Sequence, residues 1–315
     1  MKKMLLAAVG LITITTGCRN NRTEVVTESY HHKYGVPITK EDWVRNGREG
    51  SIVELMADGV TVSRTYDKGI LDGQTSYSYP NSSTIQFVET YQNGELVARM
   101  ENYISGVPMK EEKYDQGYIS VINRWYEDGT PSASERYEGG FLVQGEYKTP
   151  LNIVEAQVID GEGARILRAG EGELLAKETV KDKESIEKIT FFPNGDPASI
   201  TPYQHGLIHG IRQTFLSGGL PNTLEEWVHG HQEGVTIVYL NGEKVAEVPY
   251  IHGEKQGAER RFRDGRSVAE EITWQHGIQH GPRTILSEDG SPLKTEWYHE
   301  GELVSRPTFE RMNLR

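Results

Sequence analysis

One short formula, an aromatic residue followed by x-x-Gly-x-x-x-Gly, constrains the fold of this chain more than any other feature. In the C-terminal part it begins at Tyr203, Trp227, Tyr250 and Trp274, and a fifth copy starts at Tyr298. Consecutive anchor aromatics lie 24, 23, 24 and 24 residues apart. A fixed period of this length predicts a repeat architecture, in which each repeat is one supersecondary element stacked on its neighbours.

The same formula also occupies the N-terminal half of the chain. Tyr66 begins a full copy, whereas Tyr91, Tyr114 and Tyr137 keep only the first half, and Trp43 begins a copy with one residue redistributed. The spacings here are 23, 25, 23 and 23 residues. Both ends of the protein are therefore expected to be built from the same repeat.

A second turn signal falls near the middle of many repeats. It is an Asp-Gly or Asn-Gly pair, and the pairs are Asp58-Gly59, Asp128-Gly129, Asn194-Gly195, Asn241-Gly242, Asp264-Gly265 and Asp289-Gly290. Such pairs favour type I′ hairpin turns, which need a positive φ at both central residues. The segments between turns have strand length and partial alternation, as in Val235-x-Ile237-x-Tyr239. Each repeat is therefore predicted to be a β-hairpin.

Residues 141–185 interrupt this rhythm. Between Tyr137 and Tyr203 lie 66 residues, close to three periods, but no aromatic residue stands at the two expected intermediate places. We interpret the segment as degenerate repeats, and an inserted domain is the alternative.

The repeat formula and the Asn/Asp-Gly turns together resemble the MORN-repeat family, in particular the bacterial variant found in YwqK-type antitoxins. The resemblance covers residues 43–140 and 186–305. It implies an all-β fold: an elongated antiparallel β-meander of 23–24-residue hairpins that forms a single-layer repeat sheet.

In such a sheet the anchor aromatics would fall at equivalent places and form one column, which we expect to serve as a binding face. The column comprises Tyr66, Tyr91, Tyr114, Tyr137, Tyr203, Trp227, Tyr250, Trp274 and Tyr298. The first glycine of each C-terminal copy is expected to be a structural turn residue with positive φ. These glycines are Gly206, Gly230, Gly253, Gly277 and Gly301.

The N-terminus has the pattern of an export signal. Lys2 and Lys3 precede an apolar run from Met4 to Ile14, which is too short to span a bilayer but fits a signal-peptide core. Small residues then lead into Cys18, the single cysteine of the chain, as in a bacterial lipobox. That resemblance implies removal of residues 1–17 and lipidation of Cys18. An ordinary cysteine after an uncleaved anchor is the alternative.

This pattern predicts an exported protein that is attached to the cell envelope by lipid. Arg19 stands where an inner-membrane retention signal would have Asp, so in a diderm bacterium we expect the outer membrane. The predicted organisation is a signal peptide at 1–17, a polar tether at 18–40, N-terminal repeats at 41–140, degenerate repeats at 141–185 and C-terminal repeats at 186–315.

Histidines and acidic residues are the candidates for chemistry. The pairs His205–His209 and His276–His280 share one spacing and could hold a metal ion across a turn, but repeat-equivalent histidines are better explained as a structural ladder. Paired acidic residues such as Glu225-Glu226 are expected to form a solvated face. The sequence has no recognisable hydrolase or phosphate-binding motif, so we predict neither catalytic residues nor a metal or cofactor.

Three functions follow as hypotheses. The first is a non-enzymatic envelope lipoprotein whose repeat sheet binds a protein or a cell-wall polymer. The second is the antitoxin role that the family resemblance implies, and the third is an enzyme that acts on envelope polymers. A net charge of −12 disfavours nucleic acid and lipid headgroups as partners, so membrane contact is expected through the N-terminal lipid only.

Overall fold

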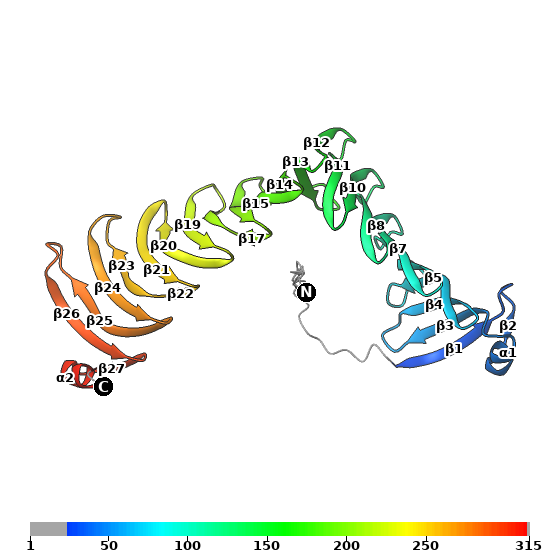
Figure 1. Ribbon diagram of the computed structural model, residues 1–315, viewed down its shortest axis with the longest axis horizontal. Coiled ribbons are helices and arrows are strands. Elements are labelled where there is room, and N and C mark those ends of the chain that lie inside the picture. Colours follow the sequence, from blue (N-terminus) through cyan, green and yellow to red (C-terminus); the bar gives the residue numbers. More distant parts are fainter. Residues whose placement is uncertain (1–23, 314–315) are drawn as a thin grey trace, which may run out of the picture. The chain divides into compact units, whose positions relative to one another are not determined.

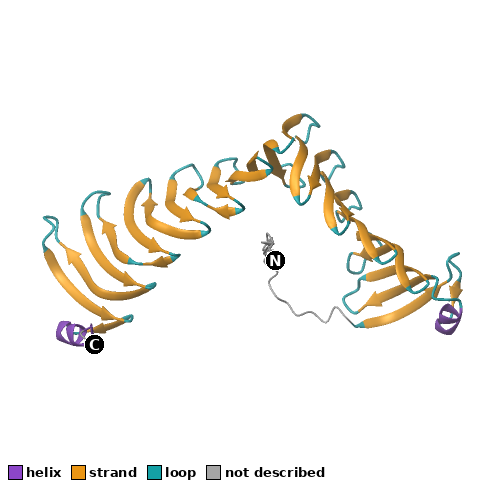
Figure 2. Cartoon of the chain, viewed as in Figure 1, coloured by secondary structure: helices purple, strands orange, loops and turns teal. Residues whose placement is uncertain are grey.

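The computed structural model describes residues 24–313, which are built almost entirely of antiparallel strands (Figure 1, Figure 2). The chain forms two compact units: unit 1 ends at Glu173 and unit 2 begins at Leu174. The predicted signal peptide and the proposed lipidation site Cys18 lie outside the described residues. Within residues 24–313, no helix is both long and apolar enough to span a lipid bilayer.

Unit 1 is a β-meander in which each strand from β3 onward pairs with the next one in the sequence, up to β13. Strand β1 pairs with both β2 and β3. Its elements are β1 (Val25–His31), β2 (Pro37–Ile38), α1 (Lys40–Arg45), β3 (Gly50–Met56), β4 (Thr61–Asp67), β5 (Ile70–Ser78), β6 (Ile85–Gln92), β7 (Glu95–Asn102), β8 (Pro108–Asp115), β9 (Tyr118–Trp125), β10 (Pro131–Glu138), β11 (Phe141–Lys148), β12 (Val154–Ile159) and β13 (Glu162–Arg168).

Unit 2 continues the same antiparallel pairing of successive hairpins. Its elements are β14 (Leu174–Lys181), β15 (Glu184–Phe191), β16 (Pro197–Gln204), β17 (Leu207–Ile208), β18 (Gly210–Phe215), β19 (Pro221–Val228), β20 (His231–Leu240), β21 (Glu243–Ile251), β22 (Glu254–Lys255), β23 (Gly257–Phe262), β24 (Val268–Gln275), β25 (Ile278–Leu286), β26 (Pro292–His299), β27 (Glu302–Val304) and α2 (Arg306–Asn313).

The all-β fold class and the antiparallel meander are thus confirmed. Residues 141–185 fold as strands in the same antiparallel manner, and the two units divide inside this segment. The expectation of a polar tether is wrong from Val25 onward, because Val25–His31 forms β1 and pairs with β3 over most of its length. Its aperiodic sequence concealed this strand, whose exposed side chains are held mainly by backbone pairing.

A short helix closes the N-terminal side of unit 1. Thr39 caps α1 by accepting a hydrogen bond from the Asp42 amide, and the buried Trp43 packs against Tyr30 and Tyr66 with ring centroids 5.4 and 5.7 Å apart. The redistributed first copy of the formula therefore begins in a helix, whose Trp43 packs on the first strands. Repeat proteins commonly have such atypical terminal elements.

The Asp-Gly and Asn-Gly turns differ from the prediction at five of their six places. Of the six Asp-Gly and Asn-Gly pairs, Asn241-Gly242 alone has positive φ at both residues. At Asp58-Gly59 the Gly59 amide donates to Met56 O, and the Asp58 carboxylate accepts from the Val60 amide at 3.1 Å. This is the three-residue loop in which a type I turn precedes a left-handed glycine, and the Asp side chain favours it by bonding the backbone two residues ahead.

The two-residue type I′ turns lie instead in the connection that follows each anchor aromatic. The glycines singled out from the sequence, Gly206, Gly230, Gly253, Gly277 and Gly301, have φ between 74° and 85°. The residue before each of them has φ between 48° and 52°. Four of these preceding residues are histidines, so the histidine in the formula occupies the first central position of a type I′ turn.

The second glycine of the formula marks an enlarged β-bulge. In the copy that begins at Trp274, three residues of β25 (residues 280–282) lie opposite the single residue Thr273, and Gly281 there has φ 111°. In the half copies, which lack this glycine, the second strand carries only one extra residue. For example, Ala98 pairs with Thr90 and Leu96 pairs with Tyr91, so Val97 between them has no partner in the ladder. The glycine also lies opposite the next anchor, because Gly281 pairs with Tyr298.

Stacked turns join neighbouring repeats along one edge of the sheet. In most full copies the amide of the turn glycine donates to a backbone carbonyl of the preceding repeat, as from Gly253 to Gln232 at 2.9 Å. The residue after one turn glycine also covers the next turn glycine: a Cβ built on Gly94 would lie 3.1 Å from the Ile70 side chain. Since buried apolar side chains are few, this nearest-neighbour coupling carries much of the stability.

The two glycines of one copy should respond differently to the same substitution. Gly277→Asn keeps a residue that tolerates the left-handed conformation at φ 74°, and we expect a loss of less than about 1 kcal/mol. Gly281→Asn places a side chain at φ 111°, within about 3 Å of Thr273, and should cost about 2 kcal/mol or more. Urea unfolding followed by circular dichroism measures both, and equal losses would show that the bulge does not require glycine.

Candidate binding surface

The anchor aromatics are half-buried at equivalent places in their repeats. Unit 1 carries Tyr66, Tyr91, Tyr114 and Tyr137, and unit 2 carries Tyr203, Trp227, Tyr250, Trp274 and Tyr298. We call the sheet side that bears them the anchor face of each unit. Their half-exposed rings are compatible with the expected binding face, whose role in binding stays a prediction.

Several anchors are fixed by a glutamate on the same strand. Residues two apart on a strand share a face, so the polar atom of the aromatic side chain reaches the carboxylate two residues earlier. The pairs are Tyr91–Glu89 at 3.0 Å, Tyr114–Glu112 at 2.9 Å, Tyr137–Glu135 at 3.0 Å, Trp227–Glu225 at 2.9 Å and Tyr298–Glu296 at 3.3 Å. Our sequence reasoning missed this Glu-x-aromatic signal, which recurs in both units.

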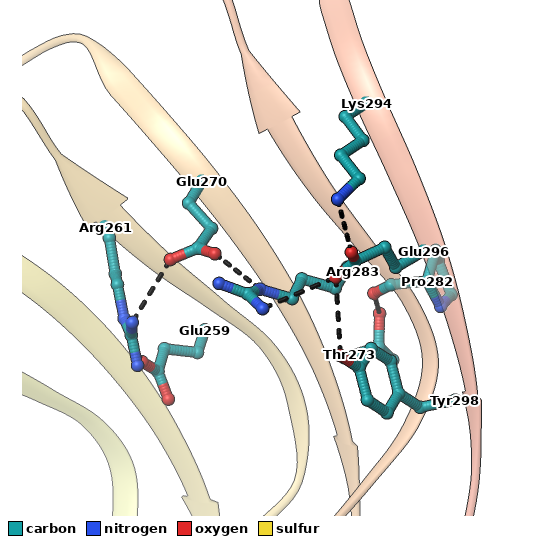
Figure 3. Close-up of polar contacts among 9 residues, drawn as sticks. All are labelled: Glu259, Arg261, Glu270, Thr273, Pro282, Arg283, Lys294, Glu296 and Tyr298. Atoms are coloured by element: carbon teal, nitrogen blue, oxygen red, sulfur yellow. Dashed lines mark hydrogen bonds and ion pairs between the residues drawn. The ribbon is translucent and has the colours of Figure 1, made fainter. Parts of the chain in front are cut away.

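Glutamates of the anchor face, some of them partners of an anchor, also take part in ion pairs between neighbouring strands. In unit 2, Glu270 accepts from Arg261 at 3.1 Å and from Arg283 at 2.6 Å, and Arg283 also lies 3.4 Å from Glu296 (Figure 3). Lys294 approaches Glu296 at 2.6 Å. The anchor face therefore carries a ladder of alternating charges that links one hairpin to the next.

The expectation that the paired acidic residues form a solvated face is wrong for Glu225, which is 9% exposed. Glu225 lies 2.8 Å from Arg212 and accepts from the Trp227 indole. The pattern misled us because adjacent residues of a strand point to opposite faces, so Glu225 belongs to the ladder while Glu226 is exposed.

Not every anchor follows this rule. Ile272 stands where Trp274 would need a glutamate, and the Trp274 indole nitrogen is buried without a hydrogen-bond partner among the described residues. The Lys255 ammonium lies 4.4 Å from the centre of the Trp274 ring instead. A cation over the face of an indole is favourable, so this repeat stabilises its anchor through the ring rather than through the nitrogen.

The environment of the ladder shifts the pKa values of its members. Burial, and then the hydrogen bond to the neighbouring carboxylate, raise the pKa of Tyr91 and of Tyr114 to about 12. For Glu225 burial acts in the upward direction, but hydrogen bonds from Thr223, Arg212 and Trp227 outweigh it and lower its pKa. Tyr91 and Tyr114 thus stay protonated as donors, and Glu225 stays ionised as an acceptor, at neutral pH.

The most enclosed charged cluster in the described part of unit 1 surrounds Glu135, which is 1% exposed. Its carboxylate lies 2.6 Å from Arg165 and 2.9 Å from Arg124. It also accepts hydrogen bonds from the Tyr147 and Tyr137 hydroxyls at 2.9 and 3.0 Å. Burial would raise the pKa of Glu135, but the two guanidinium groups outweigh burial and lower it to about 2.

Removing this carboxylate should cost stability in a pH-dependent way. The lowered pKa means that the stabilisation is full above the unfolded-state pKa of about 4.3 and is lost as the pH falls through about 2. We expect Glu135→Gln to cost about 3 kcal/mol at pH 7, because it leaves two partly buried guanidinium groups without their anion.

Urea unfolding at pH 7 and at pH 2.5 measures this effect, and the loss should shrink to about 1 kcal/mol at the lower pH. Glu138→Gln on the same strand is the control, since the exposed Glu138 makes only a surface pair with Arg136 and should change stability by less than about 0.5 kcal/mol. A loss that is the same at both pH values would contradict the assignment.

The histidines form contacts between repeats. The ring of His209 lies beside that of His229, and the ring of His280 beside that of His299, with centroids 5.0 and 4.9 Å apart. His209 Nδ1 accepts from the His229 amide at 3.3 Å, while Nδ1 of His205 lies 3.4 Å from Glu184. Within residues 24–313, no three His, Cys, Asp or Glu side chains group closely enough to hold a metal ion.

The face of unit 1 opposite the anchors is hollowed over β9 to β12. A cleft of about 500 Å³ is lined by residues that include Val121, Ser134, Gln144, Gln157 and Ile159. An adjoining cleft of about 240 Å³ shares Ser134 and Glu146 with it and adds Asn123, Trp125 and Pro131. The sequence formula concerns the anchor side of the sheet, so it carried no signal for these clefts.

Comparisons with known proteins show little likeness. No family model matches the chain, and no curated protein matches it. Solved structures titled "Crystal Structure of TcdB2-TccC3" and "Crystal Structure of TcdB2-TccC3-Cdc42" are similar at 9% identity, with TM-scores of 0.19 and 0.18, over 86% of this chain. The chain spans 17% of the length of those chains, and TM-scores this low carry no argument. The MORN-like character of the repeat therefore stays a resemblance.

Proposed function

We propose that the protein is a non-enzymatic scaffold of the cell envelope that binds a protein or a cell-wall polymer through its repeat sheet. The observation that carries this proposal is the repetition of one surface pattern. Half-exposed aromatic side chains recur at equivalent places in consecutive repeats, several with the same glutamate partner. A surface with a regular repeat offers an extended partner several equivalent contacts, which together bind more tightly than any one of them.

The chemistry of the surface supports a binding role. The ionisable groups of the anchor face are held in ion pairs and hydrogen bonds between strands, as in the series Arg261, Glu270 and Arg283. Such a rigid arrangement keeps the neighbouring rings in place, so that they lose little conformational freedom when a partner binds. Attachment to the envelope rests on the signal-peptide pattern and on Cys18.

Replacing two anchors of unit 2 tests the binding role. Trp227→Ala together with Trp274→Ala should reduce the capture of a partner by chemical crosslinking in intact envelopes, because both rings would supply contact area. Ile211→Ala with Ile251→Ala, which changes two exposed apolar residues of the same unit, is the control and should capture normally. Circular dichroism must show that both variants stay folded. Undiminished capture by the folded tryptophan variant would refute a role for the anchors.

The envelope assignment has a separate test. Labelled palmitate should enter the wild-type protein and not Cys18→Ser, because Cys18 is the single cysteine that could carry the acyl chains. Cell fractionation should then find the wild-type protein with membranes and the variant released from them. Equal incorporation of label in both proteins would contradict lipidation at Cys18 and favour the antitoxin hypothesis.

A further inference from the structure

The face of β9 to β12 opposite Glu135 carries a continuous row of polar side chains. Ser134 pairs with Asn123 on one side and with Glu146 on the other, and Glu146 pairs with Gln157. Cross-strand partners share a face, whereas Glu135, the next residue after Ser134, points to the anchor face. This row is therefore separate from the Glu135 cluster.

Hydrogen bonds along the row hold its groups in place. Ser134 Oγ donates to Asn123 Oδ1 at 2.8 Å, and Asn123 Nδ2 donates to Glu111 Oε2 at 2.8 Å. Gln157 Nε2 donates to Glu146 Oε2 at 3.4 Å. An amide and a carboxylate have more donor and acceptor sites than these bonds use, so groups remain to bind a ligand. Ser134, Gln144 and Gln157 are exposed.

The charged groups that line the two clefts are balanced. Lys148 lies 3.3 Å from Glu146, and Arg136 lies 3.4 Å from Glu138. Arg124 is paired with the buried Glu135. A phosphate-rich polymer would need several basic side chains free to meet it, so this balance disfavours such a ligand. The clefts fit a neutral ligand that bears many hydrogen-bonding groups.

Apolar surface flanks the polar row. Trp125 lies two residues after Asn123 on β9, on the same face. It lines the smaller cleft beside its cross-strand neighbour Pro131. Val121 and the exposed Ile159 line the larger cleft. An indole that borders amide and hydroxyl groups can contact the C–H face of a sugar ring while the polar row bonds its hydroxyls.

We propose that the two adjoining clefts on β9 to β12 bind a neutral glycan chain. The larger cleft has a volume of about 500 Å³, within the range of small-ligand sites, and the two clefts adjoin at the shared residues Ser134 and Glu146. This inference rests on the proposed scaffold function and narrows its ligand from a protein or a polymer to a neutral polysaccharide.

Isothermal titration calorimetry tests the proposal with purified full-length protein. The probes are chitohexaose, cellohexaose and the neutral polysaccharide fraction of the host envelope. We expect at least one of them to bind, and Gln144→Ala with Gln157→Ala to weaken that binding about ten-fold or more, because two exposed hydrogen-bonding groups are lost. Trp125→Ala should weaken binding as well.

Gln74→Ala with Gln92→Ala is the matched control, since both are exposed glutamines of unit 1 on strands outside the clefts. It should bind the glycan as the wild-type protein does. Failure of every glycan to bind the wild-type protein, or an unchanged Kd in the folded Gln144/Gln157 variant, would overturn the inference.

A photocrosslinker placed at Gln144 separates this inference from the scaffold proposal. Crosslinking to polysaccharide in intact envelopes supports the glycan site. Crosslinking to a protein instead would overturn the glycan site and leave the scaffold function standing. If the wild-type protein crosslinks to no partner at all, the scaffold proposal itself is refuted.

Discussion

Contact between each hairpin and its immediate neighbour is the constraint on which this structure depends. A sheet with so few buried apolar side chains must be stabilised along its own layer. Backbone pairing supplies the first bond between hairpins, the stacked turn glycines supply the second, and the Glu–Arg ladder supplies the third. The turn-glycine bonds join residues about one repeat apart, whereas the strand pairs and ion pairs join residues of adjacent strands. Because every hairpin needs the same contacts to its neighbour, the same residue types return with a nearly constant period.

The formula that defines the repeat can now be explained residue by residue. The aromatic residue lies opposite the bulge glycine of the preceding copy, as Tyr298 lies opposite Gly281. The first glycine completes a type I′ turn, and the second allows the enlarged bulge. A ring beside a glycine compensates for the missing side chain, so the spacing of the formula follows from the geometry of two successive hairpins.

The fold class could be predicted from the sequence because turn chemistry and period are local signals. The turn types could not be predicted, because an Asp-Gly pair such as Asp58-Gly59 fits both a type I′ turn and a three-residue loop. The hydrogen bond from the Val60 amide to the Asp58 side chain favours the loop. Strand β1 was missed because its sequence lacks the formula, and its pairing with β3 is a contact between distant residues. The column of anchors was predicted, whereas the enclosed Glu135 cluster depends on Arg165, 30 residues away, and has no local signal.

The two sides of the sheet in unit 1 differ in chemistry. The anchor face uses its charges internally, as the pairing of Glu135 with Arg124 and Arg165 shows, and its polar groups mainly stabilise the fold. The opposite face over β9 to β12 exposes amide and hydroxyl groups in clefts, where they are accessible to a ligand. Stability and recognition can therefore be altered separately by mutation on the two sides.

Deletion of one whole repeat tests most directly the claim that stability comes from nearest-neighbour contacts. Removing residues 251–274 joins Tyr250 to Gln275 and keeps the aromatic-x-x-Gly formula intact. Hydrogen–deuterium exchange followed by mass spectrometry should then find the remaining hairpins of unit 2 still protected, with faster exchange confined to the repeats beside the junction. Loss of protection throughout unit 2 would contradict this account and would indicate a single cooperative core.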